Sequence, residues 1–428
     1  LLRAIRDNPL RAQALGHNIH SYKLAIFVVA AVYTGFAGGL LGMMQGFMPP
    51  DAFTFDTSGQ IVMQTAIGGA GTLFGPLLGA TVWFYLSDLL QTTLHLGATW
   101  KLVLGIIFVL LICFLQRGLV GAIADLYDLV TGGRKTGGPA EDATVAAHAV
   151  GAAPSRAPAK PSAGAVRQRP AGSKSGPILR ATGLTKRYGG VVANSDIDFT
   201  VDHGEMRGII GPNGAGKSTF FKMLTCEVPP TSGKIVFEGN DVTGKGVADV
   251  CQLGLTKSYQ INQLFERLTV RQNLTIAALG EIRGKFKLDL LKSLSRVPGL
   301  DSQVEGTASL VNLTRRLDTP VSELAYGEKR RLEVGLALAT SPSLLLLDEP
   351  LAGMSPQERV ETVALLKSIA QGRTMIIIDH DMDSLFELVE KVTVLQEGRV
   401  LVEGTPDEIK NNAKVQEAYL GGVREEMA

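Results

Sequence analysis

The first third of the chain carries apolar runs in which charged residues are rare. From Tyr22 to Met48 the only charged side chain is Lys23, and this run exceeds the roughly 20 residues with which a helix crosses the hydrocarbon core of a bilayer. The pattern predicts a transmembrane helix at about 22–48. Arginines precede this run, whereas Pro49–Ser58 holds two aspartates and no Lys or Arg. Because positive residues mark the cytoplasmic side, we predict that the helix runs from inside to outside.

Leu1–Gly16, which precedes that helix, spaces its apolar residues among arginines. This pattern is typical of short amphipathic helices beside a membrane. The chain starts at Leu1, and Leu1–Ile5 lacks the charged-then-apolar order of a signal peptide. We therefore expect a longer membrane domain that is truncated at this end.

Further apolar stretches follow before residue 118. Gln60–Ile67 is too short to cross a bilayer, residues 77–94 are long enough, and residues 100–115 are nearly so; the loop at 68–76 is rich in glycine. If both ends of the membrane region are cytoplasmic, the number of crossings must be even. We therefore predict that residues 60–75 enter from outside and break within the protein, where neighbours bury their backbone or it lines a cavity. The predicted membrane domain is 1–131, with a cytoplasmic segment at 1–16 and membrane helices at about 22–48, 60–94 and 100–117.

Glycines recur at every fourth position in two of these stretches, and each row would let another helix approach closely. We favour ordinary helix packing over a pore-lining role for them. The two rows are Gly38, Gly42, Gly46 and Gly71, Gly75, Gly79.

Residues 132–177 are dominated by Gly, Ala, Pro and Ser and hold almost no large apolar side chains. Such a segment does not bury enough surface to fold. We predict a disordered linker here, with a root-mean-square span of roughly 35–40 Å.

From residue 178 onward the pattern changes to short β-rich runs that alternate with helical stretches. This alternation predicts an α/β domain with a largely parallel sheet over 178–428. The runs are Val192–Val201, Met206–Ile210, Lys234–Phe237, Leu344–Leu347, Thr374–Ile378 and Val392–Leu395.

Composition agrees with a membrane part joined to a soluble part, because 45% of the residues are hydrophobic while 19% are charged. A net charge of +1 gives no reason to expect nucleic acid as a partner. Cys113, Cys226 and Cys251 lie far apart, without the spacing of metal ligands. We therefore expect buried thiols and a reducing compartment for the soluble part.

A phosphate-binding motif follows the predicted strand Met206–Ile210. The segment GPNGAGKST opens a helical stretch, which is the context that such a loop requires. Its glycines let backbone N–H groups face the phosphates, while Lys217 reaches the β- and γ-phosphates and Ser218 ligates magnesium. We predict ATP and Mg²⁺ as cofactors. The predicted nucleotide-binding residues of the loop are Gly211, Asn213, Gly214, Gly216, Lys217, Ser218 and Thr219.

Two carboxylates, Asp348 and Glu349, follow the apolar run Leu344–Leu347. A buried central strand would deliver both to the nucleotide at the carboxyl edge of the sheet. We predict that Asp348 helps to hold the coordination shell of Mg²⁺ and that Glu349 orients or deprotonates the attacking water.

Between these motifs lies LAYGE, followed by the helical run Lys329–Thr340. With it, residues 178–428 resemble the ATPases of ABC transporters: an α/β P-loop fold with a helical subdomain. LAYGEKRRLE and the closing stretch VQEAYLG are most similar to the ATP-binding subunits of branched-chain amino acid importers. The resemblance implies that two ATPases pair head to tail and that this signature segment of one completes the phosphate site of the other. The segment consists of Leu324, Ala325, Tyr326, Gly327 and Glu328.

The same resemblance assigns further roles. Tyr188 stacks on adenine, His380 contacts the γ-phosphate, and Gln260 serves catalysis and magnesium in the loop that links the nucleotide to the permease. Ala325 stands where most such ATPases have a serine, and Ser355 where they have an aspartate. Because Gly327 retains its backbone donor, we expect one phosphate contact fewer and no loss of activity.

The membrane region resembles the last third of branched-chain amino acid permeases. RAIRDNPLRAQALG followed by YKLAIFVVAAVYTGFAGGL is similar to their cytoplasmic coupling segment and next helix, and IGGAGTLFGPLLGA to their later region. The resemblance implies that Ala4–Leu15 docks on an ATPase near Gln260. A plain juxtamembrane amphipathic helix is the alternative.

These expectations combine into ATP-driven import of branched-chain or related small amino acids across the bacterial inner membrane, with a cytoplasmic ATPase domain. The implied partners are a second ATPase subunit, a second permease subunit and a periplasmic substrate-binding protein. Relatives of this type also carry amides, urea or aromatic acids, so the solute stays open. A membrane-anchored regulatory ATPase is disfavoured by the several predicted spans, and an exporter by the resemblances.

Overall fold

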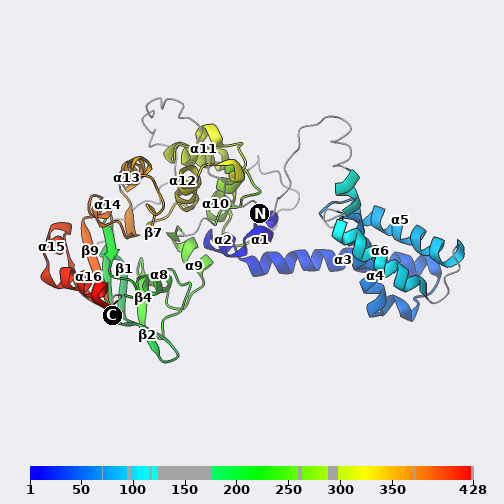
Figure 1. The fold of residues 1–428 in the computed structure, drawn as a ribbon, viewed down its shortest axis with the longest axis horizontal. Coiled ribbons are helices and arrows are strands. Elements are labelled where there is room, and N and C mark those ends of the chain that lie inside the picture. Colours follow the sequence, from blue (N-terminus) through cyan, green and yellow to red (C-terminus); the bar gives the residue numbers. More distant parts are fainter. Residues whose placement is uncertain are drawn as a thin grey trace. The chain divides into compact units, whose positions relative to one another are not determined.

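The computed structural model describes residues 1–69, 71–93, 99–114, 118–123, 176–258, 263–287, 297–370 and 372–425 (Figure 1). Gln260 and residues 132–175 of the predicted linker lie outside the described residues. The chain divides into two compact units. We call Leu1–Val29 with Ala157–Ala428 the α/β unit, and Ala30–Arg156 the helical unit.

The α/β unit contains a six-stranded sheet whose strands from β9 to β6 are parallel, with β10 antiparallel at one edge. Strands β3 and β8 are buried along their whole length, as is typical of a parallel sheet covered on both faces. The strand order is β10 (Arg399–Gly404), β9 (Lys391–Gln396), β3 (Met206–Ile210), β8 (Thr374–Ile378), β7 (Leu344–Asp348) and β6 (Leu255–Lys257).

A second, four-stranded sheet is antiparallel throughout. The largely parallel arrangement predicted from the sequence is therefore found in one of the two sheets. Strand β1 is absent from the predicted runs because Arg180, Lys186 and Arg187 interrupt its apolar pattern. The order is β2 (Val191–Asp202), β1 (Pro177–Tyr188), β4 (Ser232–Phe237) and β5 (Asn240–Asp241).

Helices cover these sheets, and α10, α11 and α12 pack on one another as a helical subdomain (Figure 1). The α/β fold with a helical subdomain is thus confirmed. The helices are α8 (Lys217–Leu224), α9 (Val247–Leu253), α10 (Val270–Arg283), α11 (Leu300–Leu310), α12 (Tyr326–Leu338), α13 (Pro356–Ala370), α14 (Met382–Phe386), α15 (Pro406–Lys410) and α16 (Ala413–Glu425), with 3₁₀ turns η5 (Thr314–Arg316) and η6 (Val321–Glu323).

The first residues of the chain belong to the α/β unit. Two short helices, α1 (Leu2–Asp7) and α2 (Pro9–Ala14), meet at Asn8, whose Oδ1 accepts a hydrogen bond from the Arg11 N–H at 3.0 Å. Such a cap satisfies one of the free donors at the start of α2. The apolar face of both helices is buried in the same core as the helical subdomain.

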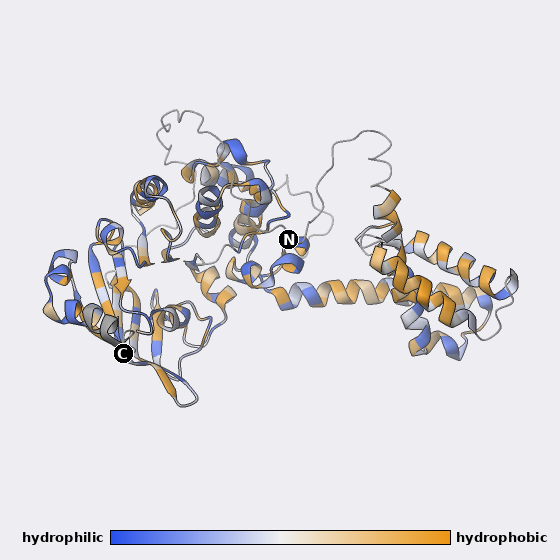
Figure 2. Cartoon of the chain, viewed as in Figure 1, coloured by the Kyte–Doolittle hydropathy of each residue, from blue (hydrophilic) through white to orange (hydrophobic). Residues whose placement is uncertain are grey.

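The helical unit is orange along most of its helices in Figure 2 because its side chains are mainly apolar. Within the described residues, α3 (Ile19–Gln45) is the one helix long and apolar enough to cross a membrane. The predicted span at 77–94 is divided into an α-helix and a π-helical turn, and the helix from residue 100 has 15 residues. The other elements are η1 (Pro50–Phe53), α4 (Phe55–Gly68), α5 (Gly75–Asp88), η2 (Leu89–Thr93) and α6 (Trp100–Phe114).

Candidate nucleotide site and coupling interface

The loop after β3 has the geometry of a phosphate cradle. Gly211, Gly214 and Gly216 have φ angles of +154°, +79° and +89°, a region that side chains beyond glycine rarely adopt. A Cβ on Gly216 would also lie 2.6 Å from the Asn194 amide nitrogen. Helix α8 begins directly after this turn, at Lys217. The glycines of the predicted motif are therefore required by the backbone itself.

Lys217 points its ammonium group back over the loop. Its Nζ donates to the carbonyl oxygens of Gly211 at 2.5 Å and Pro212 at 2.9 Å. Burial lowers the pKa of this ammonium, and the charge of Glu349 opposes that shift. The hydroxyl of Ser218 is on an exposed residue in the first turn of α8. The loop therefore presents a cation, a hydroxyl and a helix N-terminus on one side, which fits a nucleoside triphosphate.

Strand β7 delivers Asp348 to the edge of the sheet beside this loop. Burial raises the pKa of Asp348, and the nearby Lys257 ammonium opposes the shift. The Lys257 Nζ lies 3.6 Å from Asp348 Oδ2 and 3.3 Å from Glu227 Oε1. Sequence reasoning missed Lys257, although a lone lysine at the end of the buried strand β6 was a signal for it.

Glu349 adopts a left-handed backbone, with φ of +48°. A guanidinium N–H of the buried Arg330, from α12, donates to the Glu349 carbonyl oxygen. The side chain turns to His380, whose Nε2 lies 2.8 Å from Glu349 Oε1. Strands β7 and β8 are parallel and pair Asp348 with Ile378, so the residues after both strands emerge at the same edge. The structure thus brings Glu349 and His380 together.

The remaining predicted site residues lie on other elements. Tyr188 ends β1 with 49% of its surface exposed, and its ring has the Lys186 Nζ 5.1 Å from its centroid. The signature segment begins α12, where Glu328 Oε2 accepts a hydrogen bond from the Ala325 N–H at 3.1 Å. The Tyr326 hydroxyl donates to the Ala352 carbonyl at 3.3 Å. These contacts fix the N-terminal turn of α12.

The donor set fits magnesium better than a metal held by protein ligands alone. Among the described residues there is no group of three or more His, Cys, Asp or Glu side chains placed to hold an ion. Magnesium commonly takes one carboxylate and completes its octahedron with phosphate and water oxygens. Asp348 and Ser218 would hold such an ion; the role predicted for Gln260 concerns a residue outside those described.

A second surface of interest joins the N-terminal segment to α9 and α10. The carbonyl of Gly16 accepts from Gln252 Nε2 at 3.1 Å, and the same amide nitrogen lies 2.8 Å from the Gly280 carbonyl. The Asn18 N–H donates to the Lys285 carbonyl at 2.8 Å. A Cβ on Gly280 would collide with the carbonyl oxygen of Leu15. Backbone therefore packs directly on backbone across this interface.

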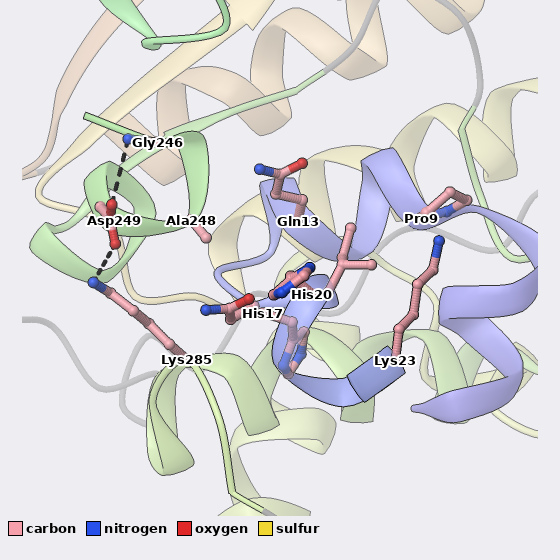
Figure 3. Close-up of a pocket in the computed structure, with 11 residues that line it drawn as sticks. Pro9, Gln13, His17, His20, Lys23, Gly246, Ala248, Asp249 and Lys285 are labelled. Carbon is pink, nitrogen blue, oxygen red and sulfur yellow. Dashed lines mark hydrogen bonds and ion pairs between the residues drawn. The ribbon is translucent and has the colours of Figure 1, made fainter. Parts of the chain in front are cut away.

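His17 is buried in the same interface. Its Nε2 lies 2.9 Å from the Ile276 carbonyl oxygen, an acceptor that requires an N–H on this nitrogen. Burial lowers the pKa of His17 to about 4, so the ring is neutral at physiological pH. Beside it is a cavity of about 450 Å³, whose lining includes Gln13 and His20 from the N-terminal segment and Asp249 and Lys285 from the opposite wall (Figure 3).

Comparison with known proteins covers both parts of the chain. The family model described as "ABC transporter" matches residues 194–352. The model "Branched-chain amino acid transport system / permease component" matches residues 1–112, and "Branched-chain amino acid ATP-binding cassette transporter" matches residues 399–425.

Individual relatives agree with these matches. The high-affinity branched-chain amino acid transport ATP-binding protein BraF of Pseudomonas aeruginosa is 34% identical over 250 residues, which are 57% of this chain and 98% of BraF. LivG of Escherichia coli, with the same description, is 33% identical over 250 residues, with the same two coverages. A solved structure, the ADP conformation of MJ1267, an ATP-binding cassette of an ABC transporter, has a TM-score of 0.50 and 30% identity and covers 57% of this chain and 99% of that cassette. The chain belongs to the ABC transporter family of branched-chain amino acid ATP-binding proteins, and it joins an ABC ATPase domain to a permease-like membrane region in one polypeptide.

Proposed function

We propose that this chain is a fused permease and ATPase component that uses ATP to import branched-chain or related small amino acids across the bacterial inner membrane. The observation that carries the proposal is the burial of the permease-like segment Leu1–Asn18 on the ATPase of the same chain. The names of the relatives favour branched-chain amino acids as solutes. A neighbouring solute class, such as amides, urea or aromatic acids, is the alternative.

The site residues account for ATP hydrolysis as follows. The cradle and Lys217 hold the β- and γ-phosphates and neutralise charge that develops on them. Asp348 and Ser218 would hold Mg²⁺, which supplies charge neutralisation at the phosphate oxygens when bound. Glu349 accepts a proton from water as the water oxygen attacks the γ-phosphorus and the bond to the β-phosphate oxygen breaks. His380, paired with Glu349 at 2.8 Å, orients that carboxylate.

Partners complete this machinery. The exposed N-terminal turn of α12 would face the γ-phosphate on a second ATPase domain, because a helix N-terminus carries partial positive charge. The dimer is head to tail, and Tyr188 stacks on the adenine bound at its own loop. A second permease subunit completes the pathway, and a periplasmic binding protein delivers the solute. Docking of Leu1–Asn18 on α9 and α10 transmits ATPase closure to the membrane helices.

The test is uptake of labelled leucine by cells carrying the complete system with either the natural chain or Glu349→Gln. We expect the variant to bind ATP with unchanged affinity and to lose at least about 100-fold in hydrolysis, because orienting water contributes to the transition state alone. Uptake should vanish with it. Lys217→Ala is the matched comparison, since it should weaken nucleotide binding itself. Unchanged hydrolysis in Glu349→Gln would contradict the assignment of the base, and hydrolysis without leucine uptake in the natural system would contradict leucine as a solute.

A further inference from the structure

The segment Arg283–Lys287, which ends α10 and follows it, is fastened to the first turn of α3. The Lys287 N–H donates to the Tyr22 hydroxyl at 3.1 Å, and that hydroxyl donates to the Lys287 carbonyl at 3.3 Å. The ring of Phe286 meets the Tyr22 ring edge-on, with centroids 4.8 Å apart. Tyr22 itself is 6% exposed. This is a specific contact, made by backbone and ring together.

The position of Tyr22 along α3 sets the height of this contact. Tyr22 lies three residues after the first residue of the helix, Ile19, which is about 4.5 Å along the axis. The apolar part of α3 begins at Leu24, within one turn of Tyr22. The residues bonded to Tyr22 are therefore held where the cytoplasmic end of a membrane-crossing α3 would enter the headgroup layer.

The chemistry of the segment suits that layer. Phe286 is 42% exposed although it is a large apolar side chain, and Lys285 and Lys287 on either side of it are exposed. Lys23, the next residue on α3, adds another exposed cation. Asp249 pairs with Lys285, which offsets one of these charges. Aromatic rings are enriched at membrane interfaces, and clustered lysines are attracted to anionic lipid.

We propose that Lys285-Phe286-Lys287 is a membrane-surface contact of the ATPase domain, with Phe286 inserted among the headgroups of an anionic phospholipid bilayer and Lys287 on their phosphates. The proposal goes beyond amino acid import and depends only on α3 crossing the membrane. The contact would add a direct attachment of the helical subdomain to the bilayer, next to its attachment to α3 through Tyr22.

The test uses the complete transporter in nanodiscs that contain phospholipid with a nitroxide on its headgroup. Trp83 and Trp100 are replaced by Phe, and Phe286→Trp becomes the fluorescent probe. Val360→Trp, at a position on α13 that is 71% exposed, is the matched control. We expect the headgroup nitroxide to quench the probe at 286 and to leave the control unquenched. Lys287→Trp serves as a second probe with the same expectation if Phe286→Trp does not assemble.

The charge component is tested by adding Lys287→Glu to the Phe286→Trp probe. Since each lysine near an anionic surface contributes about fivefold in affinity, quenching should fall in nanodiscs rich in anionic lipid and remain unchanged in neutral ones. A probe at 286 that responds to aqueous iodide but not to the lipid nitroxide would overturn the proposal. So would a probe shielded from both quenchers, which would show that a partner protein covers this surface.

Discussion

The two units of the chain treat their large apolar side chains in opposite ways. In the α/β unit most of them are buried, and Phe199, Phe220 and Phe237 are each at most 2% exposed. In the helical unit Met44 is 86% exposed and Phe55 is 89% exposed. Because each Å² of apolar surface left in water costs roughly 25 cal/mol, the helical unit needs lipid or neighbouring helices to cover it. The α/β unit carries its stability in its own core.

The same contrast recurs between the two glycine rows of the helical unit. On α5, a Cβ at Gly79 would lie 2.7 Å from the Gly68 backbone nitrogen, so α4 and α5 pack backbone to backbone. A Cβ at Gly38, on α3, has nothing within 4 Å. The packing role predicted for both rows is thus visible at Gly79, whereas Gly38 is open within the described residues.

Among the substitutions that test this contrast, we expect Gly79→Ala to destabilise the transporter most. The added methyl meets backbone atoms that cannot move independently, and such overpacking costs up to about 3 kcal/mol. We expect loss of most assembled transporter, measured as the thermal unfolding temperature and yield of the purified complex. Gly38→Ala is the matched control and should change the unfolding free energy by less than about 0.5 kcal/mol. Equal damage by the two variants would contradict the distinction between the rows.

An intermediate effect is expected from Gly280→Ala, which acts where the permease-like segment meets the ATPase. Alanine favours helix over glycine by about 1 kcal/mol, so α10 itself tolerates the change. The new methyl collides with the Leu15 carbonyl and lies 3.3 Å from His17 Nε2. A penalty of about 1.4 kcal/mol at this interface would lower solute uptake about tenfold while ATP hydrolysis persists.

The measurement is the ratio of leucine taken up to ATP hydrolysed in proteoliposomes. Gly246→Ala is the control, since its Cβ would stand at an ordinary 3.4 Å from Asp249 Oδ2. An unchanged ratio for Gly280→Ala would contradict a coupling role for the interface.

Local motifs were predictable from the sequence because each is contiguous. The loop at Gly211–Thr219 and the strands that end at Ile210 and Ile378 are found where the patterns placed them. Lys257 and Arg330 were not predicted, because their roles arise from pairing between strands and helices that lie far apart in sequence. The roles of Gln260 and of the solute pathway stay predictions.

The interface was likewise only half predictable. The spacing of apolar residues indicated amphipathic helices in Leu1–Gly16, but it did not show that His17 packs beneath α10. Nor did it show why residue 280 must be glycine, which becomes clear only once the Leu15 carbonyl is placed against it. Sequence patterns report which face of a helix is apolar, whereas the identity of the opposing backbone comes from the fold.

The smallest effect is expected from acidification and concerns His17. Its pKa is lowered to about 4 when the segment is docked, against about 6.5 for an exposed histidine. The undocked form therefore binds more protons between pH 4 and 6.5, and docking weakens as pH falls through that window. At pH 6 the loss is about 1 kcal/mol. Hydrogen exchange of Leu15–Asn18 in the complete transporter, corrected for the intrinsic pH dependence of exchange, should show less protection at pH 6 than at pH 7.5. His17→Gln should abolish this difference in protection, because the glutamine amide never becomes charged. The control is His20→Gln, at an exposed neighbouring position, which should retain the difference. Protection that is independent of pH in the natural chain would show that His17 is not buried against α10.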